Sequence, residues 1–384
     1  MQTIDVLIVG GGIIGTSCAY ELSQYELKVA LLEKNAFLGC ETSQANSGVI
    51  HSGIDPNPNK LTAKYNILGR KIWIEDWFKK LIFPRKKIAT LIVAFNNEEK
   101  LQLNLLKERG IKNSIPVENI QILDQQQTLL QEPFINPNVV ASLKVEGSWL
   151  IDPLIATKCL ALASLQNNVA IYSNKKVTKI EIDSDDDFLV FINNETTPQF
   201  KTKKLIDAAG HYADWLAETT QVDNFKQTTR KGQYLVLKNQ NNLKINTIIF
   251  MVPTIHGKGV VVAEMLDGNI LVGPNAVEGI EKNKTRSIDL DSINQIKTIG
   301  KKMVPSLQFE NSIYSFAGSR AIDIETNDFV IRTAKSNPNF IILGGMKSPG
   351  LTSSPAIAKR AVELLNLKLK KKINWNPNYN LSWI

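Results

Sequence analysis

The chain has 384 residues, of which 43% are hydrophobic and 21% charged, values typical of a globular protein long enough for two domains. Its 45 basic and 37 acidic residues give a formal net charge of +8, but the basic residues are scattered, which argues against a nucleic-acid partner. No apolar run reaches the roughly 18 residues of a membrane span. Three cysteines without a C-x-x-C pair indicate a reducing compartment. We therefore expect a cytoplasmic protein with no transmembrane segment; its oligomeric state and any peripheral membrane association stay open.

The N-terminal segment has the pattern of a doubly wound sheet. Apolar strands are predicted at Ile4–Val9 and Lys28–Glu33, with a helix between them at Ile13–Gln24. The turn after the first strand reads Gly10-Gly11-Gly12-Ile13-Ile14-Gly15, a G-x-G-x-x-G sequence placed directly before a helix. This context predicts a dinucleotide site in which the amides at the helix N-terminus face a pyrophosphate.

Each part of this turn has a chemical reason. Gly10 permits the tight bend, Gly12 lets the backbone approach the pyrophosphate, and Gly15 allows the helix to pack closely on the strand. Glu33 ends the second strand, where its carboxylate can accept hydrogen bonds from a ribose diol. No second G-x-G-x-x-G follows a strand, which disfavours an enzyme that carries both FAD and NAD.

Later segments complete a two-domain interpretation. A charged helix is predicted at Asn97–Arg109, and a strand–turn–helix order recurs at Lys204–Asp207 with Ala213–Thr219, and at Phe340–Leu343 with Pro355–Leu367. Further strands are predicted at Lys176–Ile182, Phe188–Ile192, Tyr234–Leu237, Ile248–Val252, Gly259–Val262 and Ile270–Val272. The fold class is thus α/β with an α+β second domain. Residues 1–83, 147–230 and 317–384 form a discontinuous Rossmann-type domain, and 84–146 and 231–316 form a mostly antiparallel β substrate domain with helices.

Three stretches identify a resemblance. Asn46-Ser47-Gly48-Val49-Ile50-His51-Ser52-Gly53, Ile206–Gly210 and Ser348-Pro349-Gly350-Leu351-Thr352 resemble the D-amino-acid-oxidase/glycerol-3-phosphate-dehydrogenase superfamily of flavoproteins. Within it, the whole chain resembles the short glycerol-3-phosphate oxidases of mycoplasmas and, less closely, the L-2-hydroxyglutarate oxidases and dehydrogenases. The resemblance implies FAD bound non-covalently, with no metal. It also implies oxidation of sn-glycerol 3-phosphate to dihydroxyacetone phosphate, with oxygen reduced to hydrogen peroxide.

The resemblance also implies which residues contact the cofactor. Glu33 would hold the adenosine ribose, Thr42 and Ser43 would reach the pyrophosphate, and the backbone of Val177 would bracket the adenine. The full set is Gly10, Gly12, Ile14, Gly15, Glu33, Thr42, Ser43, Ser47, Gly48, Val49, Val177, Met346, Lys347 and Thr352. Among these, Ser47, Gly48 and Val49 would line the isoalloxazine, and Met346, Lys347 and Thr352 would lie at its pyrimidine edge, where a helix N-terminus can stabilise negative charge.

The reaction needs a base for the hydroxyl proton. His51 is the candidate, because imidazole titrates near working pH and His51 follows the segment expected to face the flavin. Of the other two histidines, His211 is expected to begin a surface helix and His256 to shape the loop before Lys258.

An anionic substrate needs cations near the ring. Lys258 and Arg320 are the candidates, and their neighbouring glycines indicate tight loops close to a ligand. We expect Lys258 to bind substrate, to promote the reaction of the reduced flavin with oxygen, or to do both. Ser47 and Ser348 would complete the pocket as hydroxyl donors.

Three alternatives stay open at this point. The same His51, Lys258 and Arg320 could support oxidation of L-2-hydroxyglutarate. A flavin-containing tRNA-modification module would need a clustered basic face, and a non-catalytic nucleotide sensor would not need His51. The sequence does not separate oxygen from a quinone as the electron acceptor.

Overall fold

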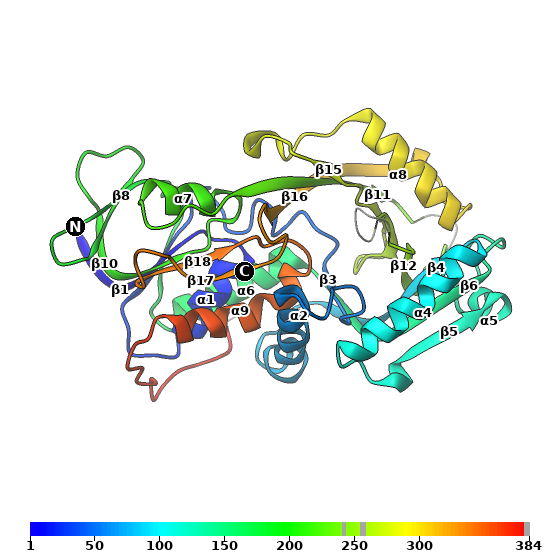
Figure 1. Cartoon of the computed structure of the whole chain (residues 1–384), viewed down its shortest axis with the longest axis horizontal. Helices are drawn as coiled ribbons and strands as arrows, with labels where there is room; N and C mark the ends of the chain where they lie inside the picture. The colour runs from blue at the N-terminus through cyan, green and yellow to red at the C-terminus, as the bar shows by residue number, and fades with distance from the viewer. Residues whose placement is uncertain (240–242, 254–258, 380–384) are drawn as a thin grey trace.

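The structure is a computed structural model that describes residues 1–239, 243–253 and 259–379. These residues form two β-sheets, and the long strands β11 (Gln227–Leu237) and β16 (Ser312–Asp323) run from one half of the molecule to the other (Figure 1). The chain crosses between the halves several times. This arrangement confirms the α/β class with an α+β second part.

The first sheet has the strand order β17-β18-β10-β1-β2-β7, extended by β9 and β8. Parallel pairs join β1 to β2 and β10, β10 to β18, and β2 to β7, as the doubly wound interpretation predicted. The strands are β1 (Gln2–Val9), β2 (Val29–Leu32), β7 (Ala170–Tyr172), β8 (Val177–Ile182), β9 (Phe188–Ile192), β10 (Phe200–Asp207), β17 (Val330–Thr333) and β18 (Phe340–Gly344).

Both faces of this sheet are covered, which explains its continuous apolar strands. Val6 and Ile8 pack with α1 (Ile13–Leu22), α6 (Pro153–Gln166) and α9 (Gly350–Leu364). Leu7 and Val9 face the other side, toward α7 (Ala213–Thr219) and the β8–β9 hairpin. The first core also contains α2 (Leu61–Ile72), the helical turn Trp73–Trp77 and α3 (Phe78–Lys80).

The second sheet has the order β15-β11-β14-β13-β12-β4-β6-β3, with β16 beside β11 and β5 beside β6. Its pairs are antiparallel except for β4 with β12. Besides β11 and β16, the strands are β3 (Val49–Ile50), β4 (Arg85–Ala94), β5 (Ile120–Asp124), β6 (Ala141–Ile151), β12 (Thr247–Met251), β13 (Val261–Glu264), β14 (Ile270–Gly273) and β15 (Val277–Glu278).

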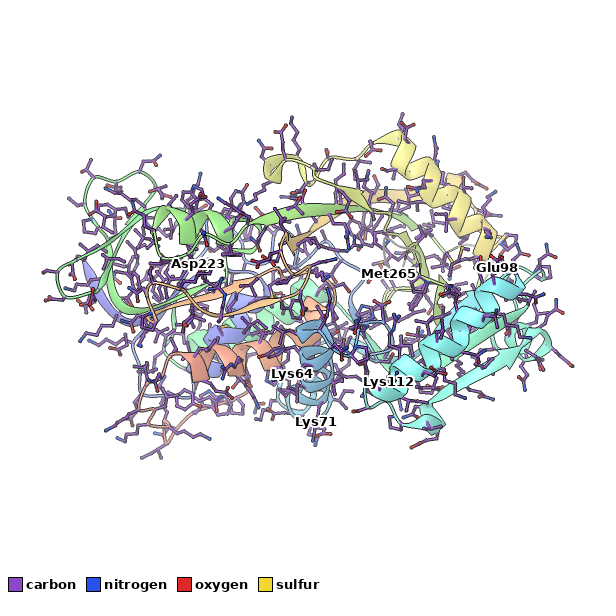
Figure 2. All side chains as sticks on the ribbon, in the orientation of Figure 1. Lys64, Lys71, Glu98, Lys112, Asp223 and Met265 are labelled. Carbon is purple, nitrogen blue, oxygen red and sulfur yellow. The ribbon has the colours of Figure 1, made fainter. Side chains whose placement is uncertain are left out.

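Helices cover this sheet too. α8 (Leu290–Met303) packs on one face, and α4 (Asn97–Lys112) on the other, while α5 (Gln125–Gln131) follows β5. Helices of both halves carry exposed charges of both signs: Lys64 and Lys71 on α2, and Glu98 and Lys112 on α4 (Figure 2). Within the described ranges, no helix has the length and apolarity that crossing a membrane requires.

The domain limits remain a prediction. The limits at 146/147, 230/231 and 316/317 fall inside β6, β11 and β16. These strands begin in one predicted domain and end in the other, so they are the rigid links between the two halves.

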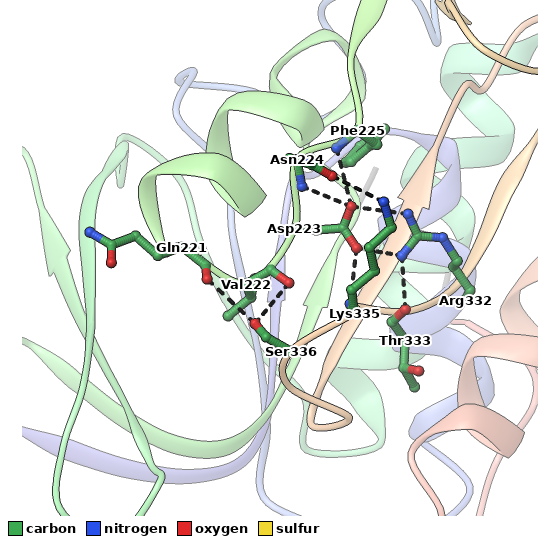
Figure 3. Close-up of polar contacts among 9 residues, drawn as sticks. All are labelled: Gln221, Val222, Asp223, Asn224, Phe225, Arg332, Thr333, Lys335 and Ser336. Carbon is green, nitrogen blue, oxygen red and sulfur yellow. Dashed lines mark hydrogen bonds and ion pairs between the residues drawn. The ribbon is translucent and has the colours of Figure 1, made fainter.

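An ion pair between a buried carboxylate and a partly exposed guanidinium fixes the edge of the first sheet. Asp223, in the segment after α7, accepts hydrogen bonds from both terminal nitrogens of Arg332 on β17 and from the backbone of Lys335 (Figure 3). Burial alone would raise the pKa of Asp223, but Arg332 and the backbone amides of Lys335 and Phe225 lower it to about 2. The pair therefore stabilises the fold when the carboxyl is ionised.

One predicted helix begins in the wrong place. The expected helix Pro355–Leu367 is α9, which starts at Gly350 and contains Pro355 in its interior. Pro355 cannot donate to the carbonyl of Leu351, but that oxygen accepts from the Trp73 indole at 3.1 Å and from the Ser354 hydroxyl at 3.0 Å. The helix passes through the proline because side chains replace the missing hydrogen bond.

Candidate active site

The glycine turn after β1 has the tight geometry that dinucleotide binding requires. Gly10 has a φ of +112°, and a Cβ there would lie 2.3 Å from the carbonyl oxygen of Ala208. A Cβ on Gly15 would lie 1.9 Å from the carbonyl oxygen of Gly10. Neither position tolerates a side chain, so the start of α1 is held directly against β1 and β10.

Glu33 organises the end of β2. It is 7% exposed, and its two carboxylate oxygens accept hydrogen bonds from the amides of Gly11 and Asn35, both at 2.8 Å. The Glu33 carbonyl accepts from Lys175 at 2.8 Å, which brings the start of β8, and with it Val177, beside the same strand end. This places Glu33 and Val177 together, as their predicted contacts with ribose and adenine require.

Thr42 and Ser43 have hydroxyl side chains with different hydrogen-bond partners. Ser43 Oγ accepts a hydrogen bond from the amide of Ile13, the first residue of α1, at 2.8 Å, and so caps that helix from 30 residues away. Thr42 instead donates its hydroxyl proton to the carbonyl of Ser319 on β16 at 2.8 Å. Ser43 therefore keeps a proton for a phosphate oxygen, whereas the proton of Thr42 is already used.

A cavity of about 350 Å³ opens between the glycine turn and the β11–β16 pair. Of the predicted site residues, Gly12, Ile14, Thr42, Ser43, Ser47, Val49, His51, Arg320, Met346, Lys347 and Ser348 line it. Gly10, Gly15, Glu33, Gly48, Val177 and Thr352 are not among its described lining residues. Lys258 and His256 lie outside the described residues. Most of the predicted cofactor and substrate residues are thus gathered in one place.

His51 follows β3 and lines this cavity, half-buried. Its amide donates to the hydroxyl of Thr352 at 3.0 Å, and that hydroxyl donates to the carbonyl of Val49 at 3.4 Å. Thr352 is fully buried in the first turn of α9, so it joins the helix to β3 behind the cavity wall. The contact fixes the backbone of His51 against the helix N-terminus.

His211 was expected to begin a surface helix, and this expectation is wrong. It is 5% exposed, and its Nε2 lies 3.0 Å from the carbonyl oxygen of Ser319. Burial lowers its pKa, so the ring is neutral at pH 7. In the described part of the chain, His211 Nδ1 and Ser319 Oγ are buried without a hydrogen-bond partner, and both residues line the cavity.

Arg320 lies on a strand and not in the tight loop that its glycine neighbours suggested. It is in β16, directly opposite Arg230 of β11. Sequence reasoning missed Arg230, Tyr234 and Asn275, which also line the cavity. One feature of the sequence could have pointed to Arg230. The run Gln227–Gln233 leads directly into a predicted strand but has no apolar residue, which is typical of a strand that carries binding groups.

Lys347 lies at the cavity edge, where its ammonium group donates to the carbonyl of Asn327 at 2.6 Å and to the Asn327 side chain at 2.5 Å. Burial, followed by the neighbouring cations Lys60 and Arg230, lowers its pKa to about 8. The cavity therefore concentrates positive charge, which favours an anionic ligand.

The donor set suits a flavin dinucleotide. His211 and Ser319 line the cavity and each has a buried polar atom without a partner among the described residues. The Ser43 hydroxyl retains its proton, and a Cβ on Gly12 would lie 2.9 Å from Ser43 Oγ, in the space where a diphosphate would approach. α1 and α9 both begin at the cavity, through Ile13 and Gly350, so two helix N-termini would stabilise an anion bound there. These groups could hold a pyrophosphate and the electron-rich edge of a reduced ring.

The fold and this site together define a flavin-dependent oxidoreductase. The chain belongs to the family of FAD dependent oxidoreductases, which matches residues 5–364. It is 62% identical to the glycerol 3-phosphate oxidase of Mycoplasma pneumoniae over 384 residues, 100% of each chain. It superimposes with a TM-score of 0.98 on the dithionite-reduced L-alpha-glycerophosphate oxidase of that organism with FAD bound, again with 62% identity and 100% coverage of both chains.

More distant relatives frame the substrate question. A glycerol 3-phosphate dehydrogenase of Caloramator mitchellensis is 34% identical over 97% of this chain and 76% of its own length. The L-2-hydroxyglutarate dehydrogenase of Caenorhabditis elegans is 29% identical over 92% of this chain and 91% of its own. These comparisons confirm the predicted family and the FAD cofactor. The higher identity to the glycerol 3-phosphate enzymes favours glycerol 3-phosphate over L-2-hydroxyglutarate as the substrate.

Proposed function

We propose that this protein oxidises sn-glycerol 3-phosphate to dihydroxyacetone phosphate and passes the electrons to oxygen, forming hydrogen peroxide. The observation that carries the proposal is one cavity that contains the capped glycine turn, His51 and Arg320. The full-length similarity to a glycerol 3-phosphate oxidase supports the choice of substrate and acceptor.

The residues divide the chemistry among them. FAD, when bound, accepts a hydride from the substrate carbon and passes two electrons to oxygen. His51 accepts the hydroxyl proton as the hydride leaves, because an imidazole can hold that proton near neutral pH. Arg320 binds the phosphate through charge-assisted hydrogen bonds, and Ser47 and Ser348 donate to substrate oxygens at the cavity wall.

Some features of the proposal rest on sequence alone. Lys258 keeps its predicted part in binding substrate or in promoting the reaction with oxygen. We also retain a cytoplasmic location, which three cysteines without a disulfide pattern favour.

The test is anaerobic reduction of the purified yellow protein. Glycerol 3-phosphate should bleach the flavin absorbance, and admitting air should restore it with one equivalent of peroxide per turnover. L-2-hydroxyglutarate should leave the spectrum unchanged. Bleaching by the hydroxyacid with none by the phosphate would reverse the choice of substrate, and slow reoxidation in air would indicate a quinone as the acceptor.

A further inference from the structure

The β11–β16 pair presents an unusual row of charges to the cavity. Arg230 on β11 lies opposite Arg320 on β16 on one side and opposite Glu278 on β15 on the other. Residues directly opposite each other on paired strands share a face, with Cβ atoms about 5 Å apart. The two guanidinium groups are therefore neighbours, and like charges in such a pair destabilise the sheet unless something offsets them.

Glu278 offsets only part of this charge. Its carboxylate binds Nε of Arg230, and its side chain is 46% exposed while that of Arg230 is 20% exposed. Among the described residues, neither terminal nitrogen of Arg230 nor any guanidinium nitrogen of Arg320 has a hydrogen-bond partner. Both residues line the cavity. The Nε contact with Glu278 leaves the terminal nitrogens of Arg230 available to a ligand.

The surroundings of Arg320 indicate the charge of that ligand. Burial lowers the pKa of Arg320, and Arg230 lowers it further. Among the residues that the structure describes, Lys347 and Asp55 also line the cavity, and Glu278 lies on the other side of Arg230. Cations thus predominate around a space where two guanidinium groups have unused donors. A planar guanidinium matches the oxygens of a phosphate in a two-pronged contact, so two of them suit a dianion.

The rest of this face is already occupied by packed groups. Gly232 and Gly318 form the next pair on the same face, followed by Tyr234 and Phe316, whose rings stack at 4.6 Å. Neighbouring segments pack directly over the glycine pair, where a Cβ on Gly318 would lie 2.0 Å from the carbonyl oxygen of Ala45 and a Cβ on Gly232 would lie 2.6 Å from the Cβ of Pro274. The anion is thereby confined to the arginine end of the strands.

Given the proposed function, we propose that Arg230 is a second phosphate-binding residue, which holds the substrate's dianion between its guanidinium and that of Arg320. Arg320 alone would suit a carboxylate or a phosphate. The pair selects the dianionic phosphate over a singly charged carboxylate. Glu278 is a positioning residue, because it touches Arg230 and directs its free nitrogens toward the cavity.

The test measures the KM for glycerol 3-phosphate and the rate of anaerobic flavin reduction at saturating substrate. Arg230→Gln should raise the KM about 10- to 100-fold, the loss expected for one charge-assisted contact, and should change the saturating rate much less, because the phosphate is remote from the reacting carbon. The inhibition constant of inorganic phosphate, a competitor that undergoes no chemistry, should rise in parallel. The matched control is Arg360→Gln, which removes the same charge from an exposed position on α9 and should leave these values unchanged.

The outcomes separate this inference from the proposed function. If the wild-type flavin is not reduced by glycerol 3-phosphate, the proposed function fails. If it is reduced but Arg230→Gln matches Arg360→Gln in KM and in phosphate inhibition, the role of Arg230 is wrong while the function stands. Should Arg230→Gln not retain FAD, Arg230→Lys decides: it keeps the charge but not the two-pronged contact, so a KM raised by about 3- to 10-fold supports the role and an unchanged KM overturns it.

Discussion

The hydrogen bond between Ser43 and the start of α1 gives the sharpest test of the cofactor site. In the free protein, Ser43→Ala removes the cap on the Ile13 amide, which should cost about 1 kcal/mol of unfolding free energy. With FAD bound, the variant also loses the hydroxyl proton that we expect a phosphate oxygen to accept. A hydrogen bond to a charged group contributes about 1.5–3 kcal/mol, so the Kd for FAD should rise roughly 10- to 100-fold.

Thr42→Val is the matched comparison. The Thr42 proton is donated to the carbonyl of Ser319, so this variant should lose about 1 kcal/mol of stability but change the Kd for FAD much less than Ser43→Ala does. Quenching of flavin fluorescence on titration into the apoprotein gives the Kd, and urea unfolding of the apoprotein gives the stability. Equal FAD affinities for wild type and Ser43→Ala would refute the assignment of Ser43 to the diphosphate.

Three further predictions concern the base, the packing and the ion pair. His51→Gln should retain FAD but slow anaerobic flavin reduction by about 10²- to 10⁴-fold in stopped-flow absorbance; undiminished reduction would favour a non-catalytic sensor. Gly318→Ala would place a Cβ 2.0 Å from the carbonyl oxygen of Ala45, so the variant should lose about 1–3 kcal/mol of stability and purify with a lower flavin-to-protein ratio. Asp223→Asn should cost about 2 kcal/mol at pH 7, since the carboxyl pKa falls from 3.8 to about 2 on folding. That stabilisation is present above pH 3.8 and is lost as the pH falls toward 2, so urea unfolding should find a smaller difference at pH 3 than at pH 7.

The first sheet was predictable because its signals are local. Strand β2 is apolar and buried throughout, β1 and β10 end in buried residues, and the glycine turn and Glu33 directly follow β1 and β2. Helix α7 was predicted with its exact limits at Ala213–Thr219. Such elements are specified by residues near in sequence, so periodicity alone finds them.

The β11–β16 pair was not predictable in the same way. β11 begins at Gln227, but only Tyr234–Leu237 has the apolar pattern of a strand. The residues of β11 before Tyr234 line the cavity or make polar contacts. Lys231 donates hydrogen bonds to Ser287 and Asp289, and the Gln233 side chain donates one to Asp289. A strand that carries binding groups loses the pattern that would identify it, which is why Arg230 was missed and Arg320 was taken for a loop residue.

The burial of His211 depends on an equally remote contact. Nothing near it in sequence predicts that β16 packs against the turn Gly210–Tyr212, yet the Ser319 carbonyl lies 3.0 Å from its ring. That same carbonyl accepts the proton of Thr42. One backbone oxygen of β16 thus joins two segments that are distant in the chain, and only the folded structure reveals it.

These contacts give the two sheets separate tasks within one cavity. In the proposed function, the glycine turn and Glu33 at the end of first-sheet strands would bind the dinucleotide, while Arg230 on β11 and Arg320 on β16 would bind the substrate anion. Because β16 also accepts hydrogen bonds from Thr42 and contacts His211, a shift of that strand would move the substrate anion relative to the flavin. We therefore expect substitutions at positions 230 and 320 to change the preference for the substrate anion without altering the dinucleotide turn.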